Sequence, residues 1–249
     1  MQCWFTIDEK FSILYGYYLG SAMDYFKHKA IEEGLADFFH CCHSKQYDAK
    51  SILIAPGDAA DTLYYIREGS VSITMEDEDG EELILAYLNQ GDFLGEIGLF
   101  SDVESRGVTV RARTKCRTEE ISYKQIKALA GNQLKACYPV LLQYIAEHMA
   151  KRLLTTTRKA GDLAFLDVAG RIKSALLELS TQPDAMKHPE GIQIKVTRQE
   201  ISRMVGCSRE MAGRVLKDLQ QEGFIWAHGK TLIIYDGDLG RALQAKDID

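Results

Sequence analysis

The chain has 249 residues, of which 46% are hydrophobic and 27% charged, and its formal net charge is −6. This length allows one large or two ordinary globular domains, and no apolar run approaches the roughly 18 residues of a membrane-spanning helix. We therefore predict a cytoplasmic protein with no membrane partner, because the N-terminus also lacks the basic start of a secretion signal.

Residues 1–23 show no clear element, and residues 1–35 are predicted to be an N-terminal extension. Six cysteines follow no CxxC spacing, at positions 3, 41, 42, 116, 137 and 207. The run His40-Cys41-Cys42-His43 invites a metal interpretation, but adjacent cysteines seldom both turn onto one ion. We expect buried thiols, no metal and no cofactor, and a cytosolic setting disfavours disulfides.

From about residue 45 to 125 the pattern is that of short strands. They are rich in β-branched and aromatic residues, and turn residues such as Pro56-Gly57-Asp58 separate them at regular intervals. The predicted strands cover residues 51–54, 62–66, 70–75, 83–88, 108–112 and 117–122. This pattern predicts an antiparallel barrel or jelly roll, in a domain at 36–138.

A glycine-rich motif lies inside this domain, over residues 91–100, and Arg106-Gly107 follows it. Its glycines permit positive φ and close backbone approach, and a short helix beginning near Gly95 would direct N–H groups at an anion. Arg106 adds a fork of charged donors for a phosphate, whereas Glu96 suits a sugar hydroxyl. A barrel corner is the alternative, but the arginine within the barrel pattern favours a nucleotide pocket.

The period becomes helical over residues 139–160, where Pro139 suits a first helical turn. The 3-4-3-4 spacing of a coiled-coil seam is followed by Leu142, Ile145, Met149, Arg152 and Thr156. Polar residues on that seam favour a dimer interface beside a ligand over a helix that only covers the barrel. We predict a dimerisation helix, with Gly161-Asp162 as a hinge.

Residues 163–236 are predicted to form a winged helix-turn-helix domain, followed by a tail at 237–249. Thr197 and Glu200 form a capping-box pattern, Gly206-Cys207 makes the turn, and Ser208 caps the second helix. A hairpin around His228-Gly229-Lys230 supplies the wing.

The second helix carries Arg209, Glu210 and Arg214 near its start. In the major groove, arginine pairs with guanine and glutamate accepts from cytosine N4. Between Lys195 and Lys217, six basic residues stand against two acidic ones, a local charge of +4 in an acidic chain. This patch predicts a docking surface for double-stranded DNA, rather than a helical hairpin with a solvated charged face.

The chain resembles the cyclic-AMP receptor protein (catabolite activator) family of the CRP/FNR superfamily over about residues 36–235. The matching segments include Thr62-Leu-Tyr-Tyr-Ile66, Gly95-Glu-Ile-Gly-Leu-Phe100, Leu163-Ala-Phe-Leu-Asp-Val168 and Val205-Gly-Cys-Ser-Arg-Glu210. The resemblance implies an α+β homodimer with an N-terminal cyclic-nucleotide-binding jelly roll, a long dimerisation helix and a C-terminal winged helix-turn-helix. It also implies a transcription regulator with no catalytic residue, with cyclic AMP as its effector and RNA polymerase as a partner.

The resemblance implies a role for individual residues as well. Gly95 and Glu96 would hold the ribose, Arg106 the phosphate, and Thr157 would reach the base from the partner subunit. The full ligand-binding set is Gly95, Glu96, Arg106, Gly107, Arg152, Thr156 and Thr157. The DNA-binding set is Thr197, Arg198, Gln199 and Ser208 for phosphates, and Arg209, Glu210 and Arg214 for bases. The exposed loop at 185–191 matches the family's polymerase-touching loop, through Lys187, His188 and Gly191.

Gly107 departs from the family pattern, because the family's cyclic-AMP binders carry Ser or Thr after the arginine. Losing that charge-assisted hydrogen bond would cost about 1.5–3 kcal/mol. The segment Leu154-Thr-Thr-Thr-Arg-Lys-Ala160 resembles the Clp-like subgroup of plant pathogens. Because cyclic di-GMP releases members of that subgroup from DNA, cyclic di-GMP is the alternative effector. Two other hypotheses are a ligand-independent DNA-binding regulator and an iron–sulfur or thiol redox sensor.

Overall fold

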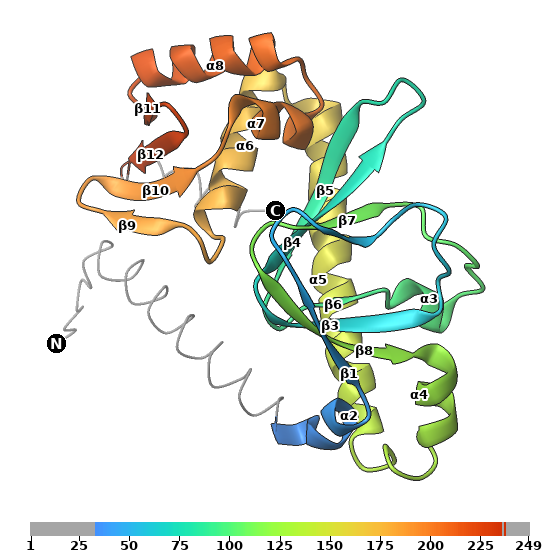
Figure 1. The fold of residues 1–249 in the computed structure, drawn as a ribbon. Coiled ribbons are helices and arrows are strands. Elements are labelled where there is room, and N and C mark those ends of the chain that lie inside the picture. The colour runs from blue at the N-terminus through green and yellow to red at the C-terminus, as the bar shows by residue number, and fades with distance from the viewer. Residues whose placement is uncertain (1–32, 236, 238–249) are drawn as a thin grey trace, which may run out of the picture.

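The computed structural model describes residues 33–235 and Gly237. A β-sandwich comes first, the long helix α5 runs along its flank, and a second domain of helices and a sheet follows (Figure 1). The predicted extension at 1–35 and tail at 237–249 lie almost entirely outside the described residues. In the described part of the chain, no helix combines the length and the apolar character that crossing a lipid bilayer demands.

Two four-stranded antiparallel sheets form the sandwich, with the orders β1-β8-β3-β6 and β2-β7-β4-β5. The strands are β1 His43–Tyr47, β2 Ile52–Ile54, β3 Thr62–Glu68, β4 Ser70–Glu76, β5 Glu82–Asn89, β6 Phe93–Leu94, β7 Thr109–Ala112 and β8 Cys116–Ser122. Their inward side chains, among them Ile66, Val71 and Val110, form an apolar core. The predicted jelly roll is confirmed.

Strands β1 and β6 and two helices of the N-terminal domain were not predicted. In β1 only Tyr47 is buried and the four residues before it are exposed, so its sequence has no apolar alternation. The short helix α4, Tyr123–Leu129, begins at a capping box in which Ser122 and Gln125 each satisfy the other's backbone N–H. The helix α2, Ala36–His40, buries Phe38 beside it in the same apolar cluster.

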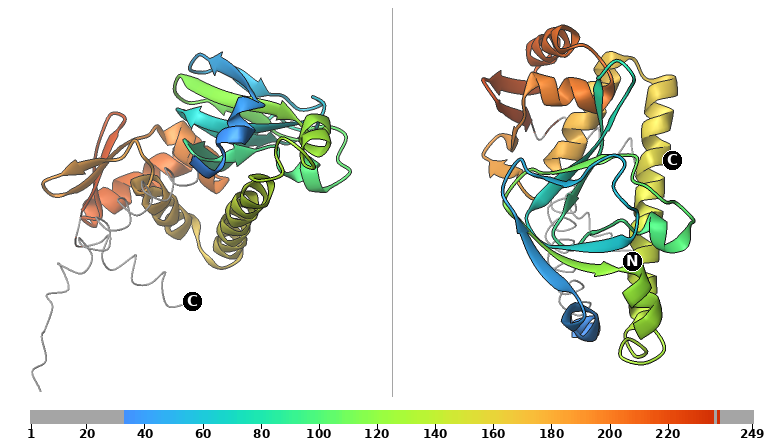
Figure 2. Two further views of the ribbon diagram at one scale, coloured as in Figure 1. Left: turned by 90° about the horizontal axis from the view of Figure 1, so that it is seen from below. Right: turned by 45° about the vertical axis from the view of Figure 1, so that its right-hand side comes forward.

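Helix α5 extends from Tyr138 to Phe165 and packs its first turns on the sandwich, where Leu141 and Tyr144 are buried with Phe93. The predicted hinge at Gly161-Asp162 is wrong, because the helix continues through both residues. The break comes at Leu166, whose backbone is extended, and a new helix then begins under the Asp167 cap. Figure 2 shows α5 alongside the sandwich, with the C-terminal domain at its far end.

The predicted seam of α5 also needs correction. Ile145 is fully buried against the sandwich and Arg152 turns toward Glu96, so neither faces outward. The apolar side chains that remain exposed include Met149, Leu153 and Leu163. They belong to a row with 3-4 spacing, which we call the open seam, at positions 142, 146, 149, 153, 156, 160 and 163.

The C-terminal domain contains the helices α6 Val168–Ser180, α7 Arg198–Val205 and α8 Arg209–Gln221. Its sheet has the order β11-β12-β10-β9, with β9 Met186–His188, β10 Gly191–Lys195, β11 Ile225–His228 and β12 Thr231–Tyr235. Buried apolar side chains of all three helices and of the sheet share one core. The predicted winged helix-turn-helix is confirmed, and the β11–β12 hairpin is the wing.

Candidate functional site

A cavity of about 790 Å³ opens between the sandwich, α5 and α6. The sandwich contributes Gly95, Glu96 and Arg106 to its wall, α5 contributes a row of mostly polar side chains, and α6 closes one end with Ser174. The predicted nucleotide motif, the long helix and the DNA-binding domain therefore all border one space. A cavity of this volume lies within the roughly 300–1,000 Å³ of small-molecule sites.

The turn that carries Gly95 and Glu96 depends on the glycine at position 95. Gly95 has φ of 85°, and a Cβ there would strike the Thr62 carbonyl oxygen and come within 3.0 Å of Arg106 Nη2. A larger residue would therefore strain the backbone and displace the guanidinium. The helix that follows, α3 Ile97–Phe100, is only one turn long, so the attraction for an anion rests on Arg106 more than on a helix dipole.

Arg106 is half-buried on the cavity wall, and both of its hydrogen bonds are made by the same nitrogen. Its Nη2 donates to the Thr62 carbonyl at 2.6 Å and to the Tyr123 hydroxyl at 3.1 Å. Within the described residues, Arg106 Nη1 and Nε make no hydrogen bond or ion pair, so their N–H groups are available to a ligand. Gly107 is exposed beside it, and a Cβ there would meet nothing within 4 Å.

Glu96 is only 5% exposed and forms an ion pair with Arg152 of α5. Arg152 also donates to the Phe93 carbonyl. A buried carboxylate needs a cation of this kind, because desolvation without a partner costs several kcal/mol. Sequence reasoning placed Arg152 near the base of a nucleotide, whereas here it neutralises the carboxylate expected to hold the sugar.

The two threonines of the predicted ligand set occupy different positions. Thr156 lines the cavity, whereas Thr157 is exposed on α5 and lies outside the cavity lining of its own chain. One further contact between α5 and the sandwich was missed by sequence reasoning. His148 Nδ1 lies 3.0 Å from Asp92 Oδ1, at the cavity edge, and no sequence pattern links residues so far apart.

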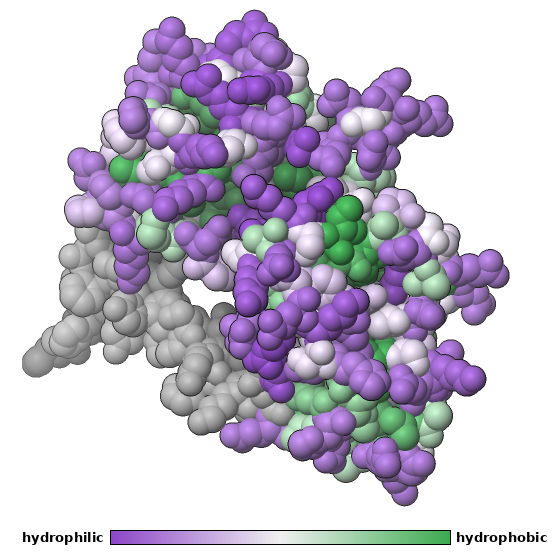
Figure 3. All heavy atoms as spheres, viewed as in Figure 1, coloured by the Kyte–Doolittle hydropathy of each residue, from purple (hydrophilic) through white to green (hydrophobic). Residues whose placement is uncertain are grey.

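The predicted DNA-binding residues lie on α7 and α8 or at the N-caps of these helices. The Thr197 side chain accepts from the Glu200 N–H and that of Ser208 from the Met211 N–H, so the predicted caps of α7 and α8 are confirmed. The predicted base-contacting residues of α8, Arg209, Glu210 and Arg214, are exposed. The outer surface over α8, at the top of Figure 3, is mostly hydrophilic, as a surface facing DNA phosphates needs to be.

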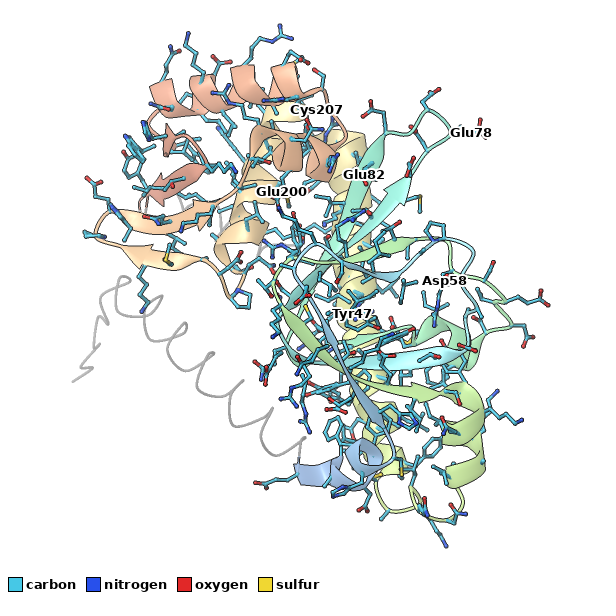
Figure 4. The ribbon with its side chains drawn as sticks, viewed as in Figure 1. Tyr47, Asp58, Glu78, Glu82, Glu200 and Cys207 are labelled. Atoms are coloured by element: carbon cyan, nitrogen blue, oxygen red, sulfur yellow. The ribbon has the colours of Figure 1, made fainter. Side chains whose placement is uncertain are left out.

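The capping box of α7 is only half formed. The Glu200 side chain accepts a hydrogen bond from the Tyr87 hydroxyl of β5, at 2.8 Å, instead of returning to the backbone of Thr197. One turn later, Arg203 pairs with Glu82 of β5 at 2.7 Å. Glu82 and Glu200 are labelled at this junction in Figure 4. The first helix of the helix-turn-helix is therefore tied to the sandwich.

Lys159 makes a second tie near the end of α5. Its Nζ donates at 3.0 Å both to the Leu85 carbonyl of β5 and to Glu178 of α6. Lys159 and Glu178 both line the cavity. One ammonium thus connects the sandwich, the long helix and the DNA-binding domain beside the candidate ligand site.

The predicted polymerase-contact loop is a β-hairpin rather than an irregular loop. Lys187 is exposed and His188 is half-buried in β9. Gly191 is buried, and a Cβ there would strike the Ile234 carbonyl oxygen. Gly191 thus fits β10 against β12, and of the three predicted contact residues only Lys187 and His188 present side chains to the surface.

Among the described residues, the surroundings of four cysteine thiols disfavour a reactive centre. Burial raises the pKa of the thiols of Cys42, Cys116, Cys137 and Cys207, which disfavours the reactive thiolate. All five cysteines in the described residues are free thiols. In the same part of the chain, no group of three His, Cys, Asp or Glu side chains gathers as metal ligands would.

Two stretches of the chain match known protein families. Residues 44–133 match the cyclic nucleotide-binding domain, and residues 194–225 match the bacterial regulatory proteins of the crp family. The first stretch contains the glycine-rich motif with Arg106, and the second contains α7 and α8.

Individual proteins are similar over most of the chain. The cAMP-activated global transcriptional regulator CRP of Salmonella typhimurium is 52% identical over 198 residues, 80% of this chain and 92% of that protein. The CRP-like protein Clp of Xanthomonas oryzae is 48% identical over 207 residues, 83% of this chain and 90% of that protein. The solved structure of the c-di-GMP responsive global regulator CLP of Xanthomonas campestris matches with a TM-score of 0.77 and 48% identity, over 82% of this chain and 98% of that one.

Proposed function

We propose, because this chain belongs to the CRP/FNR family of bacterial transcription regulators, that a cyclic nucleotide bound in the cavity controls its affinity for DNA. The chain is a regulator and not an enzyme. The observation that carries the ligand proposal is the arginine on the cavity wall, Arg106, whose Nη1 and Nε donors are available beside the Gly95 turn. As a regulator of transcription it would act in the cytoplasm, with the chromosome.

Cyclic AMP is the ligand that these groups and the relatives favour. The cyclic phosphate would bind Arg106 and the backbone N–H of Gly107, through charge-assisted hydrogen bonds. Gly95 would admit the ribose, and Glu96 would accept from its hydroxyl. The base would then meet α5 at Arg152 and Thr156. The 52% identity to a cAMP-activated regulator supports this choice.

Cyclic di-GMP, acting to release the protein from DNA, is the second candidate. Two observations favour it: Gly107 supplies no hydroxyl for a cyclic monophosphate, and the space beside it is open. The cavity also continues past α5 to Ser174 and Gln182 of the C-terminal domain, which gives room for a larger ligand. The similarity to CLP, a c-di-GMP responsive regulator, supports this alternative.

We further propose that two copies associate through the open seam of α5. Leu153 of this seam is 68% exposed, and apolar side chains in a row with 3-4 spacing are stabilised by packing against a second helix. A two-fold partner would bring its Thr157 toward the base, which explains why this residue lies outside the cavity of its own chain.

A symmetric dimer would read a palindrome with half-sites about 34 Å apart, one turn of DNA. Arg209, Glu210 and Arg214 would contact base edges in a TGTGA-like half-site. The remaining predicted residues, Thr197, Arg198, Gln199 and Ser208, would contact phosphates and set the orientation. Because such binding releases counterions, its affinity would fall with salt.

Coupling between ligand and DNA would follow from the ties at the domain junction. A ligand shifts an equilibrium only by its different affinity for two states. Two side chains connect the cavity to the helix-turn-helix domain. Lys159 donates to Leu85 and Glu178 at 3.0 Å, and Tyr87 donates to Glu200 at 2.8 Å. A ligand that moves α5 against β5 would change these bonds and reorient α8.

Recruitment of RNA polymerase would use the β9–β10 hairpin, where Lys187 and His188 lie at the surface. A surface turn without a partner is the alternative. Substituting Lys187 by Glu should reduce transcription in a purified system while leaving DNA affinity unchanged, because the hairpin lies outside the predicted DNA-binding set. Lower DNA affinity would argue against this role.

The test of the main proposal is fluorescence anisotropy on a labelled duplex with two inverted TGTGA half-sites, at fixed salt. We expect cyclic AMP to tighten binding by the full-length protein, and Arg106→Gln to abolish that response. Release of a ligand-free complex by cyclic di-GMP would select the second candidate. Indifference to both nucleotides would leave a ligand-independent regulator and refute the proposal.

A further inference from the structure

Tyr123 lies at the border between the sandwich and α4, close to the arginine of the cavity. It is the first residue of α4, and the Ser122–Gln125 capping box fixes where that helix begins. Its backbone N–H also donates to the Asp61 carbonyl at 2.8 Å. The side chain is only 7% exposed and packs in the apolar cluster beneath the cavity. The position of its hydroxyl is therefore set by rigid elements.

The Tyr123 hydroxyl makes two hydrogen bonds of opposite direction. It accepts from Arg106 Nη2 at 3.1 Å and donates to the Gly95 carbonyl. Burial raises the pKa of this phenol, so it stays protonated and keeps its donor. The hydroxyl thus links the two parts of the glycine-rich motif, the turn at Gly95 and the arginine.

These bonds decide which edge of Arg106 a ligand meets. One Nη2 N–H donates to Thr62 O, at 2.6 Å, and the other to Tyr123. The donors that remain are those of Nη1 and Nε. A free arginine side chain loses up to about 2 kcal/mol of conformational entropy when it is ordered. Part of that loss is already incurred here before an anion arrives.

The neighbouring carboxylate makes such a restraint useful. Glu96 is buried and would attract any mobile guanidinium nearby. Instead it is paired with Arg152, while Tyr123 and Thr62 hold Arg106. Arg106 and Arg152 therefore have separate partners, and Arg106 keeps its Nη1 and Nε donors for an anion.

The third glycine of the motif makes room for this tyrosine. A Cβ at Gly98 would lie 2.9 Å from the Tyr123 hydroxyl and 2.9 Å from its ring carbon Cε2. The φ of Gly98 is not in the left-handed region, so conformational freedom does not explain the glycine. Close approach of the phenol does, together with the Ala60 carbonyl oxygen, which would also lie 2.9 Å from that Cβ.

We propose that Tyr123 is a positioning residue for ligand binding, whose hydroxyl holds Arg106 in the orientation that receives the phosphate of a cyclic nucleotide. This inference rests on the proposed function, because it assigns a phosphate to Arg106. It extends that function to a residue that the glycine-rich motif does not contain and that no ligand needs to touch.

Tyr123→Phe removes the hydroxyl and keeps the ring, and Tyr47→Phe is the matched control. Tyr47 is also buried, and its replacement removes one hydrogen bond, to Glu120 at 2.7 Å, on β1 and outside the cavity lining, whereas Tyr123→Phe removes two. Titration calorimetry on the full-length protein should show cyclic AMP binding about tenfold more weakly to Tyr123→Phe. Adenosine, which has no phosphate, should bind within about twofold of wild type by ligand-detected NMR. Unchanged cyclic AMP binding, or equal losses for both ligands, would overturn the inference.

A ligand-free measurement separates this inference from the proposed function. Phenylglyoxal modifies accessible arginine side chains, and peptide mass spectrometry reports the rate at Arg106. We expect several-fold faster modification in Tyr123→Phe than in wild type or Tyr47→Phe. If the wild-type chain binds no cyclic AMP, the ligand proposal fails and this rate alone decides the inference: equal rates in all three proteins would refute it.

Discussion

Replacing Gly107 by serine should restore a phosphate contact that this chain lacks. Gly107 follows Arg106 on the cavity wall and is exposed. A Cβ at this position meets nothing within 4 Å, and its φ lies outside the left-handed region. Serine therefore fits without a clash and without backbone strain, and its hydroxyl would lie one residue from the guanidinium.

The expected gain follows from one hydrogen bond to a charged group. Such a bond contributes about 1.5–3 kcal/mol, which corresponds to roughly 10- to 150-fold in affinity. Ordering the small serine side chain offsets part of it, so an increase near the lower end, about tenfold, is expected for cyclic AMP. Replacing glycine also restricts the unfolded chain, which should raise the free energy of unfolding by about 0.4–1 kcal/mol.

Gly107→Ala is the control, because it adds the same Cβ without the hydroxyl. Titration calorimetry with cyclic AMP should rank Gly107→Ser above wild type, with Gly107→Ala close to wild type. Both variants should gain similar stability in urea unfolding. Equal affinities of the serine and alanine variants would refute the reasoning, since they would show that residue 107 does not face the phosphate.

Leu153→Glu, which changes an exposed residue of the open seam, should convert dimers to monomers in sedimentation velocity; persistence of the dimer would argue against the seam. Arg209→Ala should weaken DNA binding by about 1–3 kcal/mol and relax specificity at one base pair, whereas a uniform loss on all sequences would indicate a phosphate contact. Tyr87→Phe leaves Glu200 without its 2.8 Å donor and should lower the free energy of unfolding in urea by about 1.5–3 kcal/mol; no change would mean that the junction is open in solution. Burial raises the pKa of Tyr64 to about 12, above the ordinary value of about 10. The contribution of the protonated Tyr64 to the free energy of unfolding should therefore be complete below about pH 10 and be lost as the pH rises toward 12. Urea unfolding across that range, with tyrosinate absorbance, checks whether stability falls as the pH rises.

The elements that were predicted correctly are those specified by local chemistry. The caps at Thr197 and Ser208 need only a side-chain oxygen three residues before a backbone N–H. Gly206, with φ of 64°, supplies the left-handed turn between them. The six predicted strands alternate or run apolar within four to eight residues, a period that the sequence displays directly.

The predictions that failed depended on a neighbour. Ile145 fits a coiled-coil seam by spacing, yet the sandwich buries it completely. Glu200 fits a capping box, yet Tyr87 captures its carboxylate from another domain. Gly161 looked like a hinge because glycine weakens a helix, but α5 continues through it to Phe165. For Ile145 and Glu200, tertiary contacts outweighed the local preference.

The sequence alone was sufficient to predict the order of the domains and both helices of the helix-turn-helix, and to propose Arg106 as an anion-binding residue, since periodicity, caps and charge are properties of short segments. Only the tertiary structure revealed how the cavity is arranged. It paired Glu96 with Arg152, 56 positions away, and attached Arg106 to Thr62 and Tyr123, 44 and 17 positions away. Such pairings depend on how strands and helices are brought together by sheet register and core packing. Local periodicity does not encode which of several cations meets a given carboxylate.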